Sequence, residues 1–373
     1  MPGPRVVVKV GSSSLVGPSG ALAAERLGLV AAEVAGLRAA GAEAILVTSG
    51  AVAAGLPVLG LRPGAVTLAE KQAAAAVGQG LLMDAYREAF GPLGLEVAQL
   101  LLTRAELESP RRIGHLRRAL TALLRRAVLP IVNENDTVAV EELRIGDNDT
   151  LAALLAVVAG ADVLVLLTDI DGFYDQDPRR SQRARRVDVV ESWTPALRAA
   201  AGRAGSGLGT GGMRTKLGAA RIATAAGVET WVVRTGPGVL GAVLRKEPVG
   251  TVFRPHPRPG PRRDVWLRYG AQPRGRLILD DGAVDAVLGR QASLLLQGVT
   301  ECRGAFAAGD VVELATAADR VIARGTALLG APDLVRWLTR QERGLVRHVR
   351  VVQHRTMVMA GEGLDDGVEP RQG

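Results

Sequence analysis

The stretch Arg5-Val-Val-Val-Lys-Val-Gly-Ser-Ser-Ser14 decides the fold class of this chain. Four valines in its first six residues favour a β-strand. Because the run is apolar on both faces apart from Lys9, we expect helices to cover the strand on both sides. The glycine and serines that follow predict a turn of small residues at its carboxyl end. Such a strand is typical of a buried parallel sheet.

Outward from this strand, short β-branched runs alternate with longer alanine-rich runs up to about residue 253. The predicted strands are residues 5–10, 44–47, 96–102, 128–132, 163–167 and 229–233. The predicted helices are residues 23–40, 68–90, 112–126, 150–159 and 212–226. Alternation of this kind predicts an α/β fold, an α/β/α sandwich with a largely parallel sheet over residues 1–253.

A proline-rich segment separates this region from a second one. Residues 255–261 carry four prolines in seven positions, which predicts a stiff linker over residues 254–262. Beyond the linker, the sequence pattern changes to short predicted strands with glycine turns and two short helices. This pattern predicts a small β-rich domain over residues 263–360. Its strands are expected at 264–268, 276–279, 293–297, 310–314 and 346–352, and its helices near 283–288 and 333–340. The tail, residues 361–373, is expected to be disordered.

Bulk composition narrows the class of protein. The 373 residues suggest two or three domains, with 47% hydrophobic and 23% charged residues, as in ordinary globular proteins. The single cysteine, Cys302, excludes an internal disulfide and fits a reducing compartment. The apolar run at the N-terminus is too short for a signal peptide, and the run 151–167 is interrupted, so we expect a cytoplasmic protein without a membrane span. The net charge of +8 suits anionic partners.

Lysine is rare in this chain, and two of the lysines lie beside small-residue loops. Of the 46 lysine and arginine residues, only four are lysines: Lys9, Lys71, Lys216 and Lys246. Lysine differs from arginine in carrying a compact ammonium on a flexible stem. Residues 205–212 contain five glycines and lead into a predicted helix that begins at residue 212. The first turns of this helix carry Lys216. The loop amides and the helix N-terminus together predict a phosphate-binding site.

One polar cluster follows a predicted strand, and a second lies at the start of a predicted helix. Asn133-Glu-Asn-Asp136 and Gly146-Asp-Asn-Asp-Thr150 combine carboxylates and amides. Capping of a helix by Asp147 explains one of these carboxylates, but it does not explain two such clusters. Together, the clusters favour the binding of a small zwitterion and a magnesium nucleotide. None of the four histidines lies in these loops, so chemistry that needs charge neutralisation rather than deprotonation is favoured. Phosphoryl transfer to a carboxylate, already ionised at neutral pH, meets this requirement.

The loops taken together resemble the amino acid kinase family. The resemblance rests on Val8-Lys-Val-Gly-Ser-Ser13, Val47-Thr-Ser-Gly-Ala51, Ile131-Val-Asn-Glu-Asn-Asp136, Gly146-Asp-Asn-Asp149, Leu166-Leu-Thr-Asp169 and Gly209-Thr-Gly-Gly-Met-Arg-Thr-Lys216. It extends to Lys71-Gln72 and Ala76-Val-Gly-Gln79. The second region resembles a PUA domain, on Ala292-Ser-Leu-Leu295 and Gly309-Asp-Val-Val312. The match is close to the members of the family that phosphorylate glutamate.

The resemblance implies ATP- and Mg²⁺-dependent phosphorylation of the L-glutamate γ-carboxylate to L-glutamyl 5-phosphate, the first step of proline biosynthesis. It implies that Lys9 and Lys216 neutralise the transferring phosphoryl group and that Asp149 orients them. The residues implied for glutamate are Ser49, Asp136, Asn148 and Asn133. Those implied for the nucleotide are Lys9, Thr168, Asp169, Thr210, Gly211, Gly212, Met213, Arg214, Thr215 and Lys216. No side chain is assigned as a metal ligand.

The resemblance also implies partners and leaves alternatives open. We expect a homo-oligomer, a dimer or tetramer, and transfer of the product to glutamyl phosphate reductase. Proline is the expected feedback inhibitor, with the loop 138–145 as its location. A kinase of the same family acting on aspartate or acetylglutamate is one alternative. An RNA-binding protein, acting through the PUA-like domain, is another, although the positive charge and the aromatic residues of that domain do not favour it.

Overall fold

The computed structural model describes residues 3–17, 20–62, 64, 66–103, 106–107, 109–138, 147–176, 178, 181–194, 197, 212–290, 292–339 and 349–359. The chain divides into two compact units. The first comprises Met1–Glu106 and Gly114–Gly260, and the second comprises Leu107–Ile113 and Pro261–Gly373. The short segment 107–113 thus belongs with the C-terminal unit, although it lies early in the sequence.

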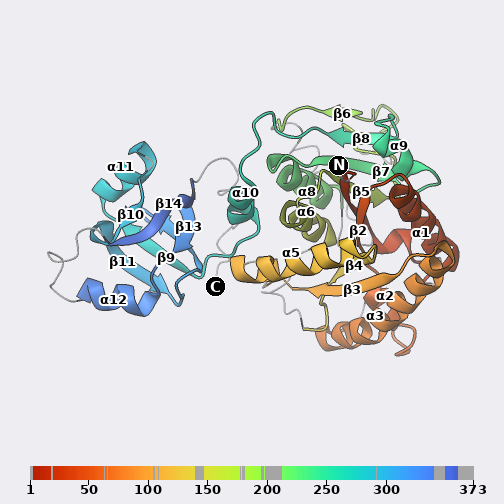
Figure 1. The fold of residues 1–373 in the computed structure, drawn as a ribbon, viewed down its shortest axis with the longest axis horizontal. Helices are drawn as coiled ribbons and strands as arrows, with labels where there is room; N and C mark the ends of the chain where they lie inside the picture. Colours follow the sequence, from red (N-terminus) through yellow and green to blue (C-terminus); the bar gives the residue numbers. More distant parts are fainter. Residues whose placement is uncertain are drawn as a thin grey trace. The chain divides into compact units, whose positions relative to one another are not determined.

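An eight-stranded sheet forms the centre of the first unit, in the order β3-β4-β2-β1-β5-β7-β8-β6 (Figure 1). Neighbouring strands are parallel except β7 and β8, which are antiparallel. The strands are β1 (Arg5–Val10), β2 (Glu43–Val47), β3 (Val97–Leu102), β4 (Leu129–Glu134), β5 (Val163–Thr168), β6 (Val189–Val190), β7 (Glu229–Arg234) and β8 (Gly250–Phe253). The predicted largely parallel sheet is confirmed. Strand β6, at one edge of the sheet, and its neighbour β8 had no counterpart among the predicted strands.

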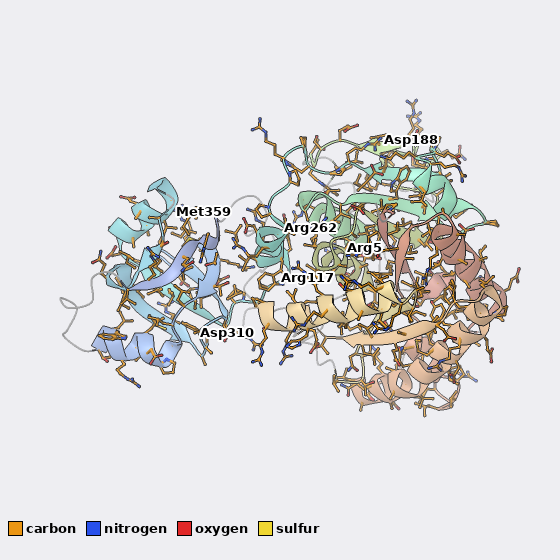
Figure 2. The ribbon with its side chains drawn as sticks, viewed as in Figure 1. Arg5, Arg117, Asp188, Arg262, Asp310 and Met359 are labelled. Atoms are coloured by element: carbon orange, nitrogen blue, oxygen red, sulfur yellow. The ribbon has the colours of Figure 1, made fainter. Side chains whose placement is uncertain are left out.

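Helices cover both faces of this sheet (Figure 1). Helices α1, α3 and α9 pack on one face, where they share a core with alternate residues of the central strands. Helices α6 and α8 pack against each other, and α6 contacts β1. Arg117 lies on α5 (Figure 2) and donates to the carbonyl of Val158 on α6 at 2.7 Å. The helices are α1 (Ala24–Ala39), α2 (Ala51–Gly55), α3 (Leu68–Phe90), α5 (Pro110–Arg125), α6 (Asn148–Ala159), α8 (Met213–Ala225) and α9 (Val239–Leu244).

The second unit contains a six-stranded sheet in the order β10-β14-β13-β12-β9-β11. Its strands are β9 (Gly275–Leu279), β10 (Leu294–Leu295), β11 (Val299–Gly304), β12 (Val311–Ala315), β13 (Val321–Ala327) and β14 (Arg350–Met359). Its helices are α10 (Arg262–Tyr269), α11 (Asp281–Arg290) and α12 (Ala331–Thr339). The high strand content predicted for this part of the chain is confirmed.

The strand predicted at residues 264–268 was wrong, because this segment is helix α10. Pro261 occupies the position before the helix, and Asp264 lies in its first turn, where an acidic side chain is favourable. The apolar run over Val265 to Leu267 is buried on the helix, and the indole of Trp266 donates to the carbonyl of Leu107. A short apolar run does not by itself distinguish a strand from a buried helix.

The proline-rich segment is held along the first unit rather than extended freely. The amide of His256 donates to the carbonyl of Thr224, and that of Gly260 donates to the carbonyl of Ala225. Both acceptors lie in the last turn of α8, whose C-terminal carbonyls have no partner within the helix. The expected disordered tail, residues 361–373, lies outside the described residues. Within the described part of the chain, no helix has the length and hydropathy needed to cross a bilayer.

Candidate active site

The alternation of β1 directs Lys9 away from the main core. Val6, Val8 and Val10 belong to the core that α1 and α3 cover. Successive side chains of a strand point to opposite faces, so Lys9 projects from the other face, where α6 contacts β1. Lys9 is 5% exposed. A lysine within a run of valines therefore places an ammonium group between the sheet and α6.

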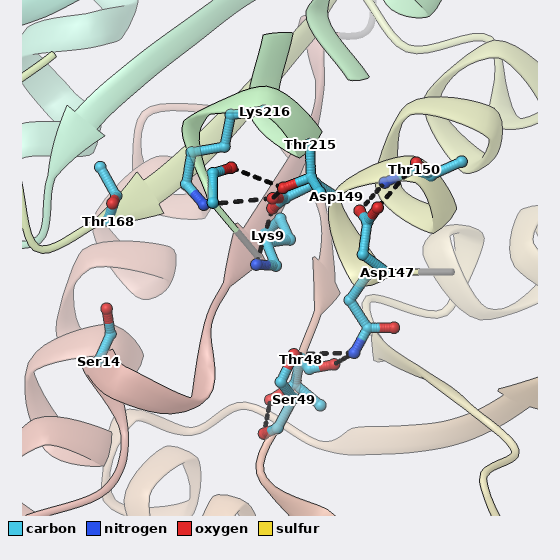
Figure 3. A network of polar contacts seen from close by, with 12 residues as sticks. Lys9, Ser14, Thr48, Ser49, Asp147, Asp149, Thr150, Thr168, Thr215 and Lys216 are labelled. Carbon is cyan, nitrogen blue, oxygen red and sulfur yellow. Dashed lines mark hydrogen bonds and ion pairs between the residues drawn. The ribbon is translucent and has the colours of Figure 1, made fainter. Parts of the chain in front are cut away.

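Asp149 binds both rare lysines of the predicted site. Its Oδ1 lies 2.7 Å from the Lys9 ammonium, and its Oδ2 lies 3.2 Å from the Lys216 ammonium (Figure 3). Asp149 is in the first turn of α6 and is 0% exposed, whereas Lys216 is in the first turns of α8 and is 6% exposed. The hydroxyl of Thr215 donates to Asp149 Oδ2 at 2.7 Å. One carboxylate thus holds residues from three elements, β1, α6 and α8.

This cluster carries one positive charge that no described carboxylate at this contact balances, since two ammonium groups meet one aspartate. Burial lowers the pKa of Lys9; Asp149 opposes the shift and Lys216 adds to it. Burial alone would raise the pKa of Asp149, but the two lysines outweigh it and keep the pKa below its usual value. A buried excess of positive charge is unfavourable without a partner, so an anion that enters here is stabilised.

Asp147 fulfils the capping role expected for one carboxylate of its cluster. It is the N-cap of α6, and its side chain accepts from the amide of Thr150 at 2.7 Å. Burial raises the pKa of Asp147, and the hydrogen bond from Thr150 partly offsets this shift. The two acidic residues of the motif thus differ: Asp147 caps the helix, and Asp149 pairs with the lysines.

A network of amides lies beside the lysines, at the carboxyl ends of β2 and β4. The Asn148 side-chain nitrogen donates to the Thr48 carbonyl and the Ser49 hydroxyl, both at 2.8 Å (Figure 3). It also donates to Asn133 Oδ1 at 3.0 Å. Three of the four residues expected to bind glutamate, Ser49, Asn133 and Asn148, are therefore in direct contact. The fourth, Asp136, lies half-buried in the turn after β4.

Helix α3 supports this network with two buried polar side chains that the sequence reasoning did not assign. Gln79 accepts a hydrogen bond from Asn133 Nδ2 at 2.9 Å. Tyr86 shares a hydrogen bond of 2.7 Å with the hydroxyl of Thr48. Burial raises the pKa of Tyr86, so the phenol remains protonated. The signal was present in the sequence as two polar residues seven positions apart on the core-facing side of an alanine-rich helix.

A second group of hydroxyls lies at the carboxyl ends of β1, β5 and β7. Ser14 and Thr235 lie 3.2 Å apart, and the amide of Thr235 donates to the carbonyl of Thr168 at 2.9 Å. The Thr168 hydroxyl donates to Asp169 at 3.1 Å. In the view of Figure 3, Ser14 and Thr168 lie on one side of the Lys9 ammonium, and Thr48 and Ser49 lie on another. Thr235 was not assigned from the sequence.

Three of the remaining predicted nucleotide residues, Gly212, Met213 and Arg214, lie at the start of α8. Gly212 is the N-cap in an extended conformation, Met213 is half-buried and Arg214 is exposed. Asp169 is exposed after β5. Thr210 and Gly211 lie outside the described residues, as does nearly all of the loop 138–145. Within the described residues, no group of three or more His, Cys, Asp and Glu side chains could hold a metal ion.

Comparison with known proteins identifies the class of this protein. Residues 4–234 match the Amino acid kinase family, and residues 275–349 match the PUA domain. The first match covers more than half of the chain, and its span contains the lysine cluster, the amide network, Ser14 and Thr168. The chain belongs to the amino acid kinase family.

The individual relatives carry a more specific name. The chain is 44% identical over 333 residues to glutamate 5-kinase of Pelobacter propionicus, and the match covers 89% of each chain. It is 47% identical over 323 residues to glutamate 5-kinase of Geobacter metallireducens, covering 86% of each. It is 44% identical over 343 residues to glutamate 5-kinase of Bifidobacterium animalis subsp. lactis, covering 92% of this chain and 90% of the relative.

Proposed function

We propose that this protein transfers the γ-phosphoryl group of ATP to the γ-carboxylate of L-glutamate, giving L-glutamyl 5-phosphate in the first step of proline biosynthesis. The observation that carries the proposal is the pair of buried lysines on Asp149. The name of the relatives agrees with it. The single cysteine and this metabolic role support a cytoplasmic location.

The reaction needs positioning and charge neutralisation. A γ-carboxylate oxygen forms a bond to the γ-phosphorus, the bond from phosphorus to the β,γ-bridging oxygen breaks, and ADP leaves with the electron pair. No proton has to move, because the attacking carboxylate is already ionised at neutral pH. Lys9 and Lys216 neutralise charge on the transferring group, and Asp149 keeps both ammonium groups in place before the reaction.

The amide network provides the glutamate site in this proposal. Asn148 uses its side-chain nitrogen on three protein acceptors, so its oxygen is directed to a donor such as the substrate ammonium group. Asp136 adds a carboxylate, half-buried after β4, that suits the same ammonium group. The hydroxyl of Ser49 and the amide of Asn133 complete the recognition of the zwitterion. An aspartate substrate, one methylene shorter, would not carry its side-chain carboxylate equally far toward the lysines.

The nucleotide is assigned to the hydroxyl side chains at the carboxyl ends of β1, β5 and β7 and to the N-terminus of α8. Thr168, Asp169 and the segment from Thr210 to Lys216 are the proposed contacts. The excess positive charge at Lys9 and Lys216 fits the phosphates of ATP. Mg²⁺ supplies charge neutralisation on the β- and γ-phosphates when it is bound. Because the described residues offer no carboxylate cluster for the ion, we propose that it enters with the nucleotide.

Regulation and assembly follow from the family resemblance. We propose that proline inhibits the enzyme through the loop 138–145, which joins the Asn133–Asp136 cluster to the Asp147–Asp149 cluster in the sequence. A bound effector there would act on both clusters. We further propose a homo-oligomer, dimer or tetramer, and direct transfer of the acyl phosphate to glutamyl phosphate reductase. The chemistry supports such a transfer, since an acyl phosphate is prone to hydrolysis in water.

The experiment that tests the function is the trapping of acyl phosphate by hydroxylamine. The protein is supplied with MgATP, hydroxylamine and one of three acids: glutamate, aspartate or acetylglutamate. Hydroxamate is expected with glutamate, with a much smaller amount from the other two. Hydroxamate from aspartate or acetylglutamate, but none from glutamate, would show that another branch of the family is the right one.

A further inference from the structure

We propose that Gln79 is a positioning residue for glutamate binding: it holds Asn133, and through Asn133 also Asn148, in the amide orientation that the substrate requires. This inference rests on the proposed function and adds to it a residue on α3, outside the loops that carry the other site residues. Gln79 itself need not touch the substrate.

The first observation is a buried hydrogen bond between helix α3 and the end of β4. Gln79 Oε1 accepts from Asn133 Nδ2 at 2.9 Å, and the two residues are 8% and 2% exposed. Leu129 and Ile131 belong to the core under α3, so the alternation of β4 brings Asn133 to the same face of the sheet. The contact is therefore a consequence of the strand pattern and the position of α3.

The polarity of the amides is set by fixed donors and acceptors. Asn133 Oδ1 accepts from the backbone amide of Glu134 at 2.9 Å and from Asn148 Nδ2 at 3.0 Å. A turned Asn133 would present its NH₂ group to both of these donors. In the observed orientation, the Nδ2 of Asn133 needs a buried acceptor, and Gln79 Oε1 provides it. Asn133 is thus held at both ends of its amide.

The same polarity determines what Asn148 offers to a ligand. Its Nδ2 is used by Thr48, Ser49 and Asn133, and its Oδ1 is buried without a hydrogen-bond partner among the described residues. An acceptor in this position suits the ammonium group of an amino acid, whereas a turned amide would present a donor to a donor. The orientation of the Asn133 side-chain amide therefore helps to keep the Asn148 amide in the orientation that binds the substrate.

Stability alone does not explain a glutamine at position 79. Its Nε2 is buried and also has no hydrogen-bond partner among the described residues. An unpaired buried donor destabilises a fold, and buried polar groups of this kind are rare. Methionine has nearly the same shape and would fill the space without that donor. The presence of a glutamine whose nitrogen is unpaired among the described residues indicates that its oxygen, which accepts from Asn133, is the functional atom.

The backbone of α3 is fixed where Gln79 begins. A Cβ atom on Gly78 would lie 1.8 Å from the carbonyl oxygen of Ala51, and one on Gly55 would lie 1.9 Å from the carbonyl oxygen of Ala74. Helices α2 and α3 therefore touch through their backbones at this level. Because the helix cannot shift freely, the side chain of Gln79 reaches Asn133 from a defined position.

The test is the variant Gln79→Met in the full chain, with steady-state kinetics and thermal unfolding. We expect KM for glutamate to rise roughly five- to tenfold, the scale of one buried hydrogen bond. The turnover number and KM for ATP should change less than about twofold, because the lysine cluster is not altered. The melting temperature should change little, since one unpaired donor is removed and another, Asn133 Nδ2, is created. Gln99→Met, at an exposed position on β3, is the matched control and should change none of these values.

Two further variants test whether Gln79 acts through Asn133. In an Asn133→Ala background, Gln79→Met should raise KM for glutamate no further, because the group that it orients is absent. Gln79→Glu keeps an oxygen acceptor and should retain KM for glutamate within about threefold of the wild type. This variant also serves if Gln79→Met does not fold.

An unchanged KM in Gln79→Met, an equal rise in both backgrounds, or an equal rise in Gln79→Glu would overturn the inference alone. Failure of the wild-type protein to form glutamyl hydroxamate would instead overturn the proposed function, and this inference with it. The two failures are thus distinguished by the wild-type measurement.

Discussion

Lys9 and Lys216 show why the identity of a positive residue matters at this site. Each ammonium group contacts one oxygen of the same buried carboxylate. A guanidinium group is larger and planar, and needs several acceptors in a fixed geometry. The rarity of lysine in this chain singled out these positions, but only the contact with Asp149 gives them a shared role.

The first residue-scale prediction concerns these lysines. Lys216→Ala and Lys9→Arg are each expected to lower the turnover number by at least about a hundredfold, the scale of losing a preorganised charge stabiliser. Lys246→Arg is the control, because Lys246 is 66% exposed in its side chain and lies 3.8 Å from Glu229, away from the cluster. The measurement is the rate of glutamyl hydroxamate formation at saturating substrates. Near-normal rates for Lys9→Arg and Lys216→Ala would refute the roles assigned to them.

The second residue-scale prediction concerns pH. Burial disfavours the charged form of Lys9, so the proton leaves at a pH below the ordinary lysine pKa of 10.5. Because the charged form is the active one, kcat/KM for ATP should fall on the alkaline side before pH 10.5 is reached. In the residual activity of Lys9→Arg, this fall should move to higher pH, since a guanidinium group stays protonated. A fall at the same pH in both proteins would assign the titration to another group.

Helix α3 illustrates how one element serves both the core and the site. Thr67 caps it in a reciprocal contact with Glu70, and the predicted bounds, residues 68–90, agree with Leu68–Phe90. Its core-facing side carries Gln79 and Tyr86, which hold the ends of β4 and β2. The periodicity of the sequence predicted the helix and its buried face. It did not predict which strands the polar residues of that face would meet.

Two glycines of α3 give a prediction at the scale of the element. Gly78→Ala is expected to lower the free energy of unfolding by about 1–3 kcal/mol or more, because the new Cβ would overlap the backbone of α2. Gly80→Ala on the same helix has no atom within 4 Å of its Cβ, and should stabilise the protein by about 0.5–1 kcal/mol through helix propensity. Denaturant unfolding of the two variants measures both values. Equal effects would show that α2 and α3 do not touch in this way.

At the scale of the whole molecule, the proposed chemistry resides in one unit. Every residue of the proposed glutamate and nucleotide sites lies in the ranges Met1–Glu106 and Gly114–Gly260. The second unit contains the PUA domain match, and several of its described arginines pair with carboxylates. Arg276 pairs with Glu313 at 2.7 Å and with Asp319 at 2.8 Å, and Arg324 pairs with Glu313 at 3.0 Å. Paired arginines are less available for phosphate contacts.

The whole-molecule prediction is that the full chain does not bind structured RNA tightly. Binding of RNA to basic residues releases counterions and weakens steeply with salt. Titration of a labelled RNA hairpin at low salt, followed by fluorescence anisotropy, should give no salt-sensitive binding in the micromolar range. Micromolar binding that salt abolishes would make the second unit an RNA-binding domain and restore that alternative.

The sequence by itself determined the alternation of strands and helices, the ends of most elements and the loops in which the chemistry lies. These features depend on the neighbours of each residue, through propensity, periodicity and capping. Tertiary structure decided which loops meet. Asp149 contacts Lys9 and Lys216 across 140 and 67 positions of the chain, and Gln79 contacts Asn133 across 54. Such contacts follow from strand order and helix position, which local sequence preferences do not encode. Helix α10 and the strands β6, β8, β11 and β13 likewise became evident only in the folded chain.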